Sequence, residues 1–228
     1  MEFEIVKQPR VFPRQQIYRR VKRIIDVATT LISLPVTLPI MLISALAIYL
    51  DSPGPVLFIQ ERIGKGGRLF RMYKFRTMKL DINNGHCQEY MQAYVRGEIR
   101  NGENGSQSGK EVFKPVDAQD IIRVGRFLRK TSIDELPQLI NVLKGEMSIV
   151  GPRPNVPWEV DAYRPWHHER LEVLPGITGL AQVNGRSCID FISLVRYDIE
   201  YIEKQSMRLD IKIMWWTLTA ALRGKGAL

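Results

Sequence analysis

The chain has few of the residues that build disulfide frameworks or zinc sites. Its 228 residues include two cysteines, Cys87 and Cys188, which lie far apart and in no metal-binding spacing. This usage excludes a disulfide-stapled scaffold and fits a reducing compartment. Because the chain has three histidines in all, we do not expect a zinc centre.

The sequence also lacks a nucleotide P-loop and an excess of acidic residues. The glycine-rich run at 64–67 has no Lys-Ser/Thr ending, so we interpret it as a structural turn. Lysine and arginine number 33 against 24 acidic residues, which gives a net charge of +9. Such a charge favours an anionic partner, whether nucleic acid, an anionic membrane face or a phosphorylated substrate. The alternative is that the positive charge only keeps the chain soluble.

One long apolar stretch is the first decisive feature. Residues 27–50 carry no charged side chain, and about 20 such residues suffice to cross a bilayer. The stretch begins well inside the chain, is too long and has no clear small-residue cleavage site. A cleaved signal peptide is therefore not expected.

Basic residues flank this stretch on both sides. They are Arg19, Arg20, Lys22 and Arg23 before it, and Arg62, Lys65, Arg68, Arg71, Lys74, Arg76 and Lys79 after it. Because positive flanks mark the cytoplasmic side, a segment that enters and returns fits better than one that crosses. Pro35 and Pro39 each disrupt a helix, and the Ser33 and Thr37 hydroxyls are available for the freed carbonyls. We predict a re-entrant helix-break-helix over 23–50; a kinked single-pass helix is the alternative.

The remaining pattern predicts an α+β domain that is mostly helical. We expect a hairpin with strands at 56–60 and 69–78 and helices at 88–99, 121–128, 134–143, 191–204 and 210–222. Trp215 and Trp216 in the last helix suit a membrane interface or a packed core equally well. The expected organisation is a basic segment at 1–22, the membrane segment at 23–50 and a cytosolic domain at 51–228, with a flexible insertion at 80–118.

Two adjacent acids, Asp134 and Glu135, are the strongest candidates for chemistry. A structural interpretation is available, because Ser132 and Glu135 fit a capping box and acids favour the first turn of a helix. The functional interpretation is that an ionised carboxylate near Arg129 acts as a nucleophile on phosphorus or as a Mg²⁺ ligand.

Two later segments suggest phosphate or nucleotide binding. Arg153 stands between Pro152 and Pro154, so its backbone is stiff and its guanidinium is suited to phosphate. The glycine-containing run 175–186 has the composition of a loop that approaches a nucleotide closely. The alternatives are that Arg153 lies in an ordinary rigid turn and that the run 175–186 is an ordinary loop.

Five ordered runs together resemble the monotopic phosphoglycosyl transferases, the bacterial sugar transferase family. They are residues 51–56, 73–78, 131–139, 141–154 and 175–186, and the family pattern covers nearly everything from Lys22 to Met214. The resemblance implies a re-entrant membrane helix and a catalytic domain on the cytosolic face of the bacterial inner membrane. Some relatives carry a large N-terminal membrane domain, and we expect this chain to correspond to the catalytic unit alone. The family often has Ser-Pro at the membrane bend, where this chain has Leu38-Pro39.

The resemblance also implies a reaction. A sugar-1-phosphate passes from a UDP-sugar to polyprenyl (undecaprenyl) phosphate, which begins the synthesis of an exopolysaccharide, O-antigen or glycoconjugate. Asp134 is implied to attack the β-phosphorus, releasing UMP and leaving a covalent aspartyl-phosphosugar. Glu135 is implied to bind Mg²⁺ together with Asp134, or to position the substrate. The positions implied to hold phosphates, nucleotide or the acid pair are Arg129, Arg153, Pro154, Arg186 and Asp210.

The sugar and the assembly state stay open. Galactose, glucose and an N-acetylated sugar are all compatible with the resemblance, as is a homodimer. Membrane lipids are expected partners and nucleic acid is not. The rivals are a basic membrane-tethered nucleic-acid-binding protein, a non-enzymatic scaffold of polysaccharide assembly, and a direct glycosyl transferase that would release UDP.

Overall fold

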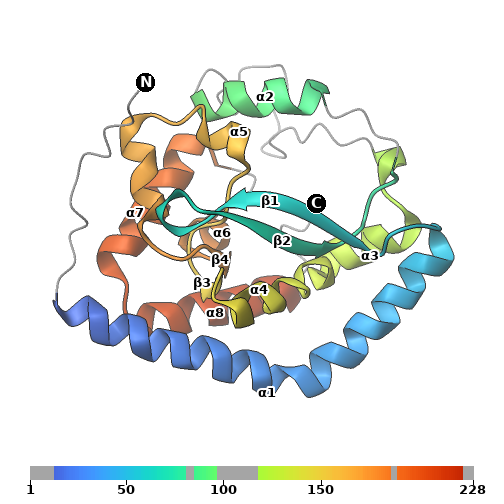
Figure 1. Cartoon of the computed structure of the whole chain (residues 1–228), viewed down its shortest axis with the longest axis horizontal. Helices are drawn as coiled ribbons and strands as arrows, with labels where there is room; N and C mark the ends of the chain where they lie inside the picture. The colour runs from blue at the N-terminus through green and yellow to red at the C-terminus, as the bar shows by residue number, and fades with distance from the viewer. Residues whose placement is uncertain (1–12, 81–84, 97–117, 186–188, 223–228) are drawn as a thin grey trace.

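A single long helix runs along one edge of the molecule. In the computed structural model, which describes residues 13–80, 85–96, 118–185 and 189–222, helix α1 (Pro13–Asp51) is continuous through Pro35 and Pro39. Figure 1 shows that α1 bends along its length but does not break. The predicted helix-break-helix is therefore replaced by one bent helix, which also runs through the boundary expected at residues 22–23.

Hydroxyl groups follow the inner part of α1, although they do not bond the carbonyls that the prolines free. The Thr30, Ser33 and Thr37 hydroxyls donate to the carbonyls of Asp26, Thr30 and Ser33, at 2.8, 2.8 and 3.0 Å respectively. The expectation that Ser33 and Thr37 compensate for the prolines is thus wrong in detail. A Ser or Thr hydroxyl reaches the carbonyl three or four residues back, and such bonds tend to bend helices.

A two-stranded hairpin crosses the centre of the molecule (Figure 1). Strands β1 (Leu57–Ile63) and β2 (Leu69–Phe75) are antiparallel, with Gln60 opposite Met72. Gly66 and Gly67 in the connecting turn have φ values of 65° and 76°, a conformation that glycine adopts without strain. The predicted hairpin is confirmed, with its strand ends shifted by a few residues.

The rest of the domain consists of short helices around a second, smaller sheet. The helices are α2 (Gly85–Arg96), α3 (Arg123–Thr131), α4 (Gln138–Lys144), α5 (Pro157–Val160), α6 (Leu180–Asn184), α7 (Phe191–Lys204) and α8 (Met207–Leu222). Strands β3 (Ser148–Val150) and β4 (Gly176–Thr178) pair in parallel. Of the predicted insertion at 80–118, α2 is ordered helix, whereas 81–84 and 97–117 lie outside the described residues. The α+β, mostly helical class is confirmed.

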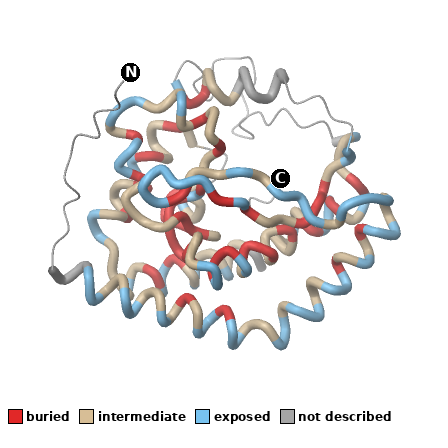
Figure 2. Tube along the Cα trace, in the orientation of Figure 1, coloured by how far each residue is buried: buried red, intermediate tan, exposed pale blue. Residues whose placement is uncertain are grey.

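Both ends of α1 pack against this one domain. In the first half of the helix, Asp26 accepts hydrogen bonds from the Ser148 hydroxyl and the Ile149 amide, and Tyr18 donates to Asp210 nearer its start. At its other end, Asp51 accepts from the Val124 amide at 3.0 Å, and Ile48 is buried with core residues of β2 and α3. The intervening stretch is largely exposed (Figure 2). By length and composition, Gln16–Asp51 is the one described helix able to cross a membrane.

Candidate active site

The acid pair lies between two helices and not inside one. Ile133–Glu135 form a short 3-10 turn, and α4 begins only at Gln138. Pro137 explains the late start, because a proline ring is tolerated only at the opening positions of a helix. Ser132 has a φ of 57° and its amide donates to the Arg129 carbonyl, so it ends α3. The predicted capping box is therefore wrong.

A lysine from the hairpin holds the two carboxylates. Lys74 Nζ lies 3.2 Å from Asp134 Oδ2 and 3.5 Å from Glu135 Oε1. Asp134 is 5% exposed, which makes it one of the most buried acids of the described residues. Lys74 was not among the predicted site residues, although it was counted among the basic residues after the apolar stretch. The alternation of side chains along β2 could have pointed to it. Lys74 lies on the same face of the strand as the buried Phe70 and Met72, so its side chain is directed toward the interior.

Arg153 completes the described charge cluster. Its Nη2 atom lies 3.0 Å from Glu135 Oε1, while 43% of its side chain remains exposed. The guanidinium therefore keeps N–H groups toward solvent that can bind another anion. The structure thus brings three predicted site residues, Asp134, Glu135 and Arg153, together with Lys74.

Hydrogen bonds to three consecutive carbonyls fix the loop that carries Arg153. They run from the Gly176 amide to Pro152 (2.8 Å), from the Arg170 guanidinium to Arg153 (3.0 Å), and from the Arg62 guanidinium to Pro154 (3.1 Å). Pro154 therefore contributes a buried carbonyl to the protein itself. The stiff backbone predicted for Arg153 is accompanied by bonds from three separate elements.

The glycines of the run 175–186 serve this same packing. A Cβ on Gly176 would stand 2.1 Å from the Gly151 amide nitrogen, and one on Gly179 would stand 2.2 Å from the Gly151 carbonyl oxygen. No side chain fits at such distances, so these glycines allow two protein backbones to touch. Their close approach is to β3 and its following loop, whereas the predicted approach to a nucleotide stays a prediction.

The cations keep Glu135 ionised. Burial alone would raise the pKa of Glu135, but Arg153 and Lys74 more than offset it and hold the pKa at about 2. Glu135 in turn raises the pKa of Arg153. Arg62, behind the loop, has a pKa lowered to about 10, chiefly by burial. The site therefore presents the ionised carboxylate of Glu135 beside fixed positive charge.

The remaining predicted residues form no described bond with this cluster or lie outside the described residues. Arg129 is half-buried in the last turn of α3, and its side chain makes no hydrogen bond or ion pair with the described residues. Arg186 lies outside the described residues. Gln138 was not predicted as a site residue. Its Nε2 atom is buried and has no hydrogen-bond partner in the described part of the chain.

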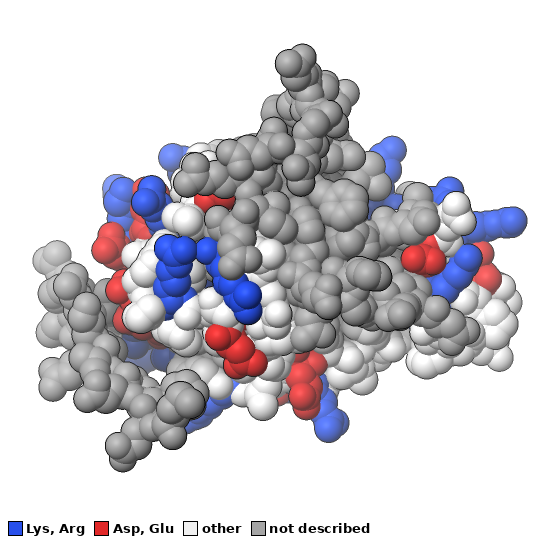
Figure 3. Space-filling view, turned by 90° about the horizontal axis from the view of Figure 1, so that it is seen from above, with Lys and Arg blue, Asp and Glu red and all other residues white. Residues whose placement is uncertain are grey.

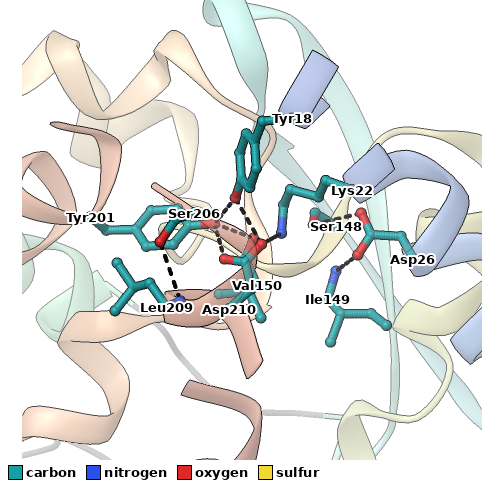
Figure 4. Close-up of polar contacts among 10 residues, drawn as sticks. All are labelled: Tyr18, Lys22, Asp26, Ser148, Ile149, Val150, Tyr201, Ser206, Leu209 and Asp210. Carbon is teal, nitrogen blue, oxygen red and sulfur yellow. Dashed lines mark hydrogen bonds and ion pairs between the residues drawn. The ribbon is translucent and has the colours of Figure 1, made fainter. Parts of the chain in front are cut away.

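Asp210 joins α8 to the start of α1 (Figure 4). Its Oδ2 atom accepts from Tyr18 at 2.7 Å and from Lys22 at 2.8 Å, and its Oδ1 atom accepts from Tyr201 at 2.8 Å. Asp210 is 2% exposed, and its described bonds do not include the acid pair. In the structure Asp210 therefore holds α8 against α1, while the predicted role in holding phosphates stays a prediction.

The donor set fits a shared magnesium ion but not a closed metal site. Within the described residues, no three His, Cys, Asp or Glu side chains are grouped to hold a metal. Mg²⁺ commonly takes one or two carboxylates and completes its shell with water and substrate phosphates. The adjacent carboxylates of Asp134 and Glu135 meet that requirement.

Figure 3 shows described lysines and arginines beside described acidic residues at several places on one face of the molecule. The active-site cluster also combines both signs of charge. Each of its two carboxylates lies within 3.5 Å of at least one of its two cations.

Residues 17–224 match the family profile described as bacterial sugar transferase. Galactosyl transferase CpsE of Streptococcus agalactiae is 40% identical over 212 residues, which cover 90% of this chain and 43% of the relative. UDP-N-acetylgalactosamine-undecaprenyl-phosphate N-acetylgalactosaminephosphotransferase of Aeromonas hydrophila is 39% identical, with coverages of 92% and 46%. UDP-glucose:undecaprenyl-phosphate glucose-1-phosphate transferase of Caulobacter vibrioides is 40% identical, with coverages of 88% and 69%. The chain thus spans less than half the length of the first two relatives.

Proposed function

The chain belongs to the bacterial sugar transferase family, and from that premise we propose that it transfers a sugar-1-phosphate from a UDP-sugar to undecaprenyl phosphate, releasing UMP. The names of two relatives, from Aeromonas and Caulobacter, describe this reaction with different sugars. Their difference leaves the sugar of this chain open among galactose, glucose and N-acetylated sugars. The product would begin an exopolysaccharide, O-antigen or other glycoconjugate.

The observation that carries the proposal is the buried Asp134 carboxylate held 3.2 Å from Lys74. An oxygen of this carboxylate attacks the β-phosphorus of the UDP-sugar, and the bond from that phosphorus to the bridging oxygen breaks. UMP leaves with the electron pair, and the phosphosugar stays esterified to Asp134. An oxygen of the lipid phosphate then attacks the same phosphorus and releases the carboxylate. Two displacements replace one direct reaction between two anions.

Fixed cations make the first approach feasible. A carboxylate and a diphosphate repel each other, and Lys74 and Arg153 supply positive charge where they meet. Arg153 is tied to Glu135 through one nitrogen, so its exposed N–H groups remain to bind phosphate oxygens. Glu135 orients Arg153 through that bond. Arg129 and Arg186 remain proposed phosphate or nucleotide ligands.

Glu135 and Asp134 would hold Mg²⁺ together with the diphosphate of the substrate. The bound ion would neutralise phosphate charge and help the UMP leaving group depart. Because Glu135 has a pKa of about 2, it stays an anionic ligand at all physiological pH values.

Helix α1 would enter the membrane and return on the same side. Asp26, just before the uncharged stretch, and Asp51, just after it, are both hydrogen-bonded to the same domain. A helix that crossed the bilayer would separate those ends by about 30 Å of hydrocarbon. With α1 bent in this way, the exposed apolar stretch, including Ile32 at 78% and Ile43 at 69% exposure, would lie in lipid. The domain then rests on the cytosolic face of the inner membrane.

A face of α8 would lie at the same membrane surface. Ile211, Trp215 and Leu218 are 59%, 62% and 53% exposed and share one side of the helix. An exposed stripe with a tryptophan is typical of an interfacial helix. Trp216, by contrast, packs against the buried cluster around Ile213.

Release of UMP tests the proposal. The purified chain with undecaprenyl phosphate and Mg²⁺ should release UMP from at least one member of a panel of UDP-sugars. Asp134→Asn should abolish that release, while Asp161→Asn, outside the cluster, should keep it. Release of UDP in place of UMP would indicate direct glycosyl transfer, and full turnover by Asp134→Asn would refute the assigned nucleophile.

A further inference from the structure

A basic cavity lies at the start of α1, away from the acid pair. It has a volume of about 90 Å³. Its charged lining consists of Arg19, Lys22 and Arg23 of α1, Lys65 of the hairpin turn, and one acid, Asp26. Leu174 and Tyr201 are among the residues of its uncharged wall.

The cavity and the acid pair lie at opposite ends of the hairpin. Lys65 is in the turn that joins β1 to β2, whereas Lys74 stands near the far end of β2. The five-residue step from Leu69 to Lys74 corresponds to roughly 17 Å of strand. None of the residues lining the cavity belongs to the cluster of Asp134, Glu135, Lys74 and Arg153. The cavity is therefore a separate site.

Two of the four cations already have partners. Lys22 pairs with Asp210 at 2.8 Å (Figure 4), and Arg23 donates to the Leu143 carbonyl at 2.9 Å. The carboxylate of Asp26 is engaged by the Ser148 hydroxyl at 2.7 Å and the Ile149 amide at 3.1 Å. Both oxygens of the acid that lines the cavity are thus engaged by residues of β3.

Arg19 and Lys65 lack a counter-charge within the described residues. Their side chains make no hydrogen bond or ion pair there. Partial burial, together with the nearby cations Arg19 and Arg68, lowers the pKa of Lys65. An anion placed between α1 and the hairpin turn would relieve this repulsion.

We propose that this cavity binds the phosphate group of an anionic bilayer lipid, as an accessory site that fastens the hairpin turn to α1 at the membrane surface. Arg23 is one helical turn before Val27, where the uncharged stretch of α1 begins, so the cavity lies where lipid head groups meet hydrocarbon. Its 90 Å³ exceeds the ~10–15 Å³ that one water needs and is below the roughly 300 Å³ of small-molecule pockets. That size suits a phosphate group and is too small for a nucleotide sugar.

Native mass spectrometry of the purified chain in detergent would test the site, with phosphatidylglycerol, phosphatidylcholine and inorganic phosphate as separate probes. The wild-type chain should retain one phosphatidylglycerol, and Arg19→Gln/Lys65→Gln should weaken this retention at least tenfold. Arg20→Gln/Lys79→Gln removes the same charge from residues that do not line the cavity and should retain lipid like the wild type. Arg19→Lys/Lys65→Arg keeps both charges and should also retain it.

The probes distinguish the source of the phosphate. Phosphatidylglycerol should bind at least tenfold more tightly than inorganic phosphate, because its acyl chains stay beside the apolar stretch of α1, and more tightly than zwitterionic phosphatidylcholine. Equal binding of inorganic phosphate would overturn the lipid assignment. Equal lipid loss in the two double variants would overturn the site itself. Should the double variant fail to fold, Lys65→Gln alone, in an exposed turn, can be compared with the wild type for lipid retention. Asp134→Asn should retain lipid normally, because the site is independent of the reaction.

Discussion

The ammonium group of Lys74 lies 3.2 Å from the carboxylate of Asp134, although the two residues come from the hairpin and from the turn before α4. Both side chains are largely buried, with 19% and 8% of their surface exposed. This contact joins the edge of the hairpin to the acid pair. It makes the position of β2 a condition for the proposed chemistry.

Removing the ammonium should therefore impair catalysis more than folding. Lys74→Gln should lower kcat/KM for UMP release by about 10²–10³-fold, the usual loss when one fixed charge or donor at a developing anion is removed. Lys79→Gln, an exposed lysine beyond the strand, is the matched control and should retain activity. Steady-state UMP release with circular dichroism as a folding check measures both effects. Unchanged kcat/KM in Lys74→Gln would contradict the assigned role.

Glu135 should make stability depend on acid pH. Its folded pKa is about 2 against an ordinary value of 4.5, so its stabilising contribution is complete above pH 4.5 and is lost as the pH falls toward 2. The shift corresponds to about 3 kcal/mol at most. The thermal midpoint of the wild-type chain should fall more steeply through this window than that of Glu135→Gln. Parallel curves would show that the cations do not hold this carboxylate ionised.

Asp210 should act on the attachment of α1 and not on substrate binding. Asp210→Asn leaves Lys22 without its charge partner in a mostly buried site, so the unfolding free energy should drop by roughly 3 kcal/mol. Glu200→Gln removes an acid from an exposed ion pair with Lys204 and should leave the denaturation midpoint almost unchanged. The KM for the UDP-sugar separates the two roles. A raised KM with normal stability would assign Asp210 to phosphate binding.

Cysteine labelling should place both flanks of α1 on one side of the membrane. In a chain with Cys87 and Cys188 replaced by serine, single cysteines introduced at Arg14 and at Gly105 should react with an impermeant maleimide in inside-out vesicles and not in intact cells. Reaction of the two positions from opposite sides would establish a single crossing. The same result would exclude the packing of both α1 ends on one domain.

Local patterns in the sequence predicted much of this fold. Alternating side chains predicted the hairpin, and helical spacing predicted α7 with the same bounds as observed, Phe191–Lys204. The start of α4 was missed because the capping pattern of Ser132 and Glu135 suggested a helix that Pro137 delays. The continuous course of α1 was missed because each proline, taken alone, predicts a break.

Long-range contacts limited the prediction of the site. Asp134, Glu135 and Arg153 were identified from local motifs and resemblance, but no local pattern states that Lys74 meets the acid pair. Asp210 bonds Tyr18 and Lys22 from the other end of the chain, a pairing that depends on how α1 packs. The glycines at 176 and 179 were interpreted as ligand-facing, whereas the atom that a Cβ would meet first at either position belongs to the backbone of Gly151.

The covalent step at Asp134 can be tested directly by intact-protein and peptide mass spectrometry. The purified chain would be mixed with its UDP-sugar and Mg²⁺ without undecaprenyl phosphate, and then quenched rapidly in acid. A covalent intermediate requires a phosphosugar mass on the peptide that contains Asp134, formed together with UMP and discharged when undecaprenyl phosphate is added. UMP and lipid product that accumulate with no adduct on that peptide would contradict it.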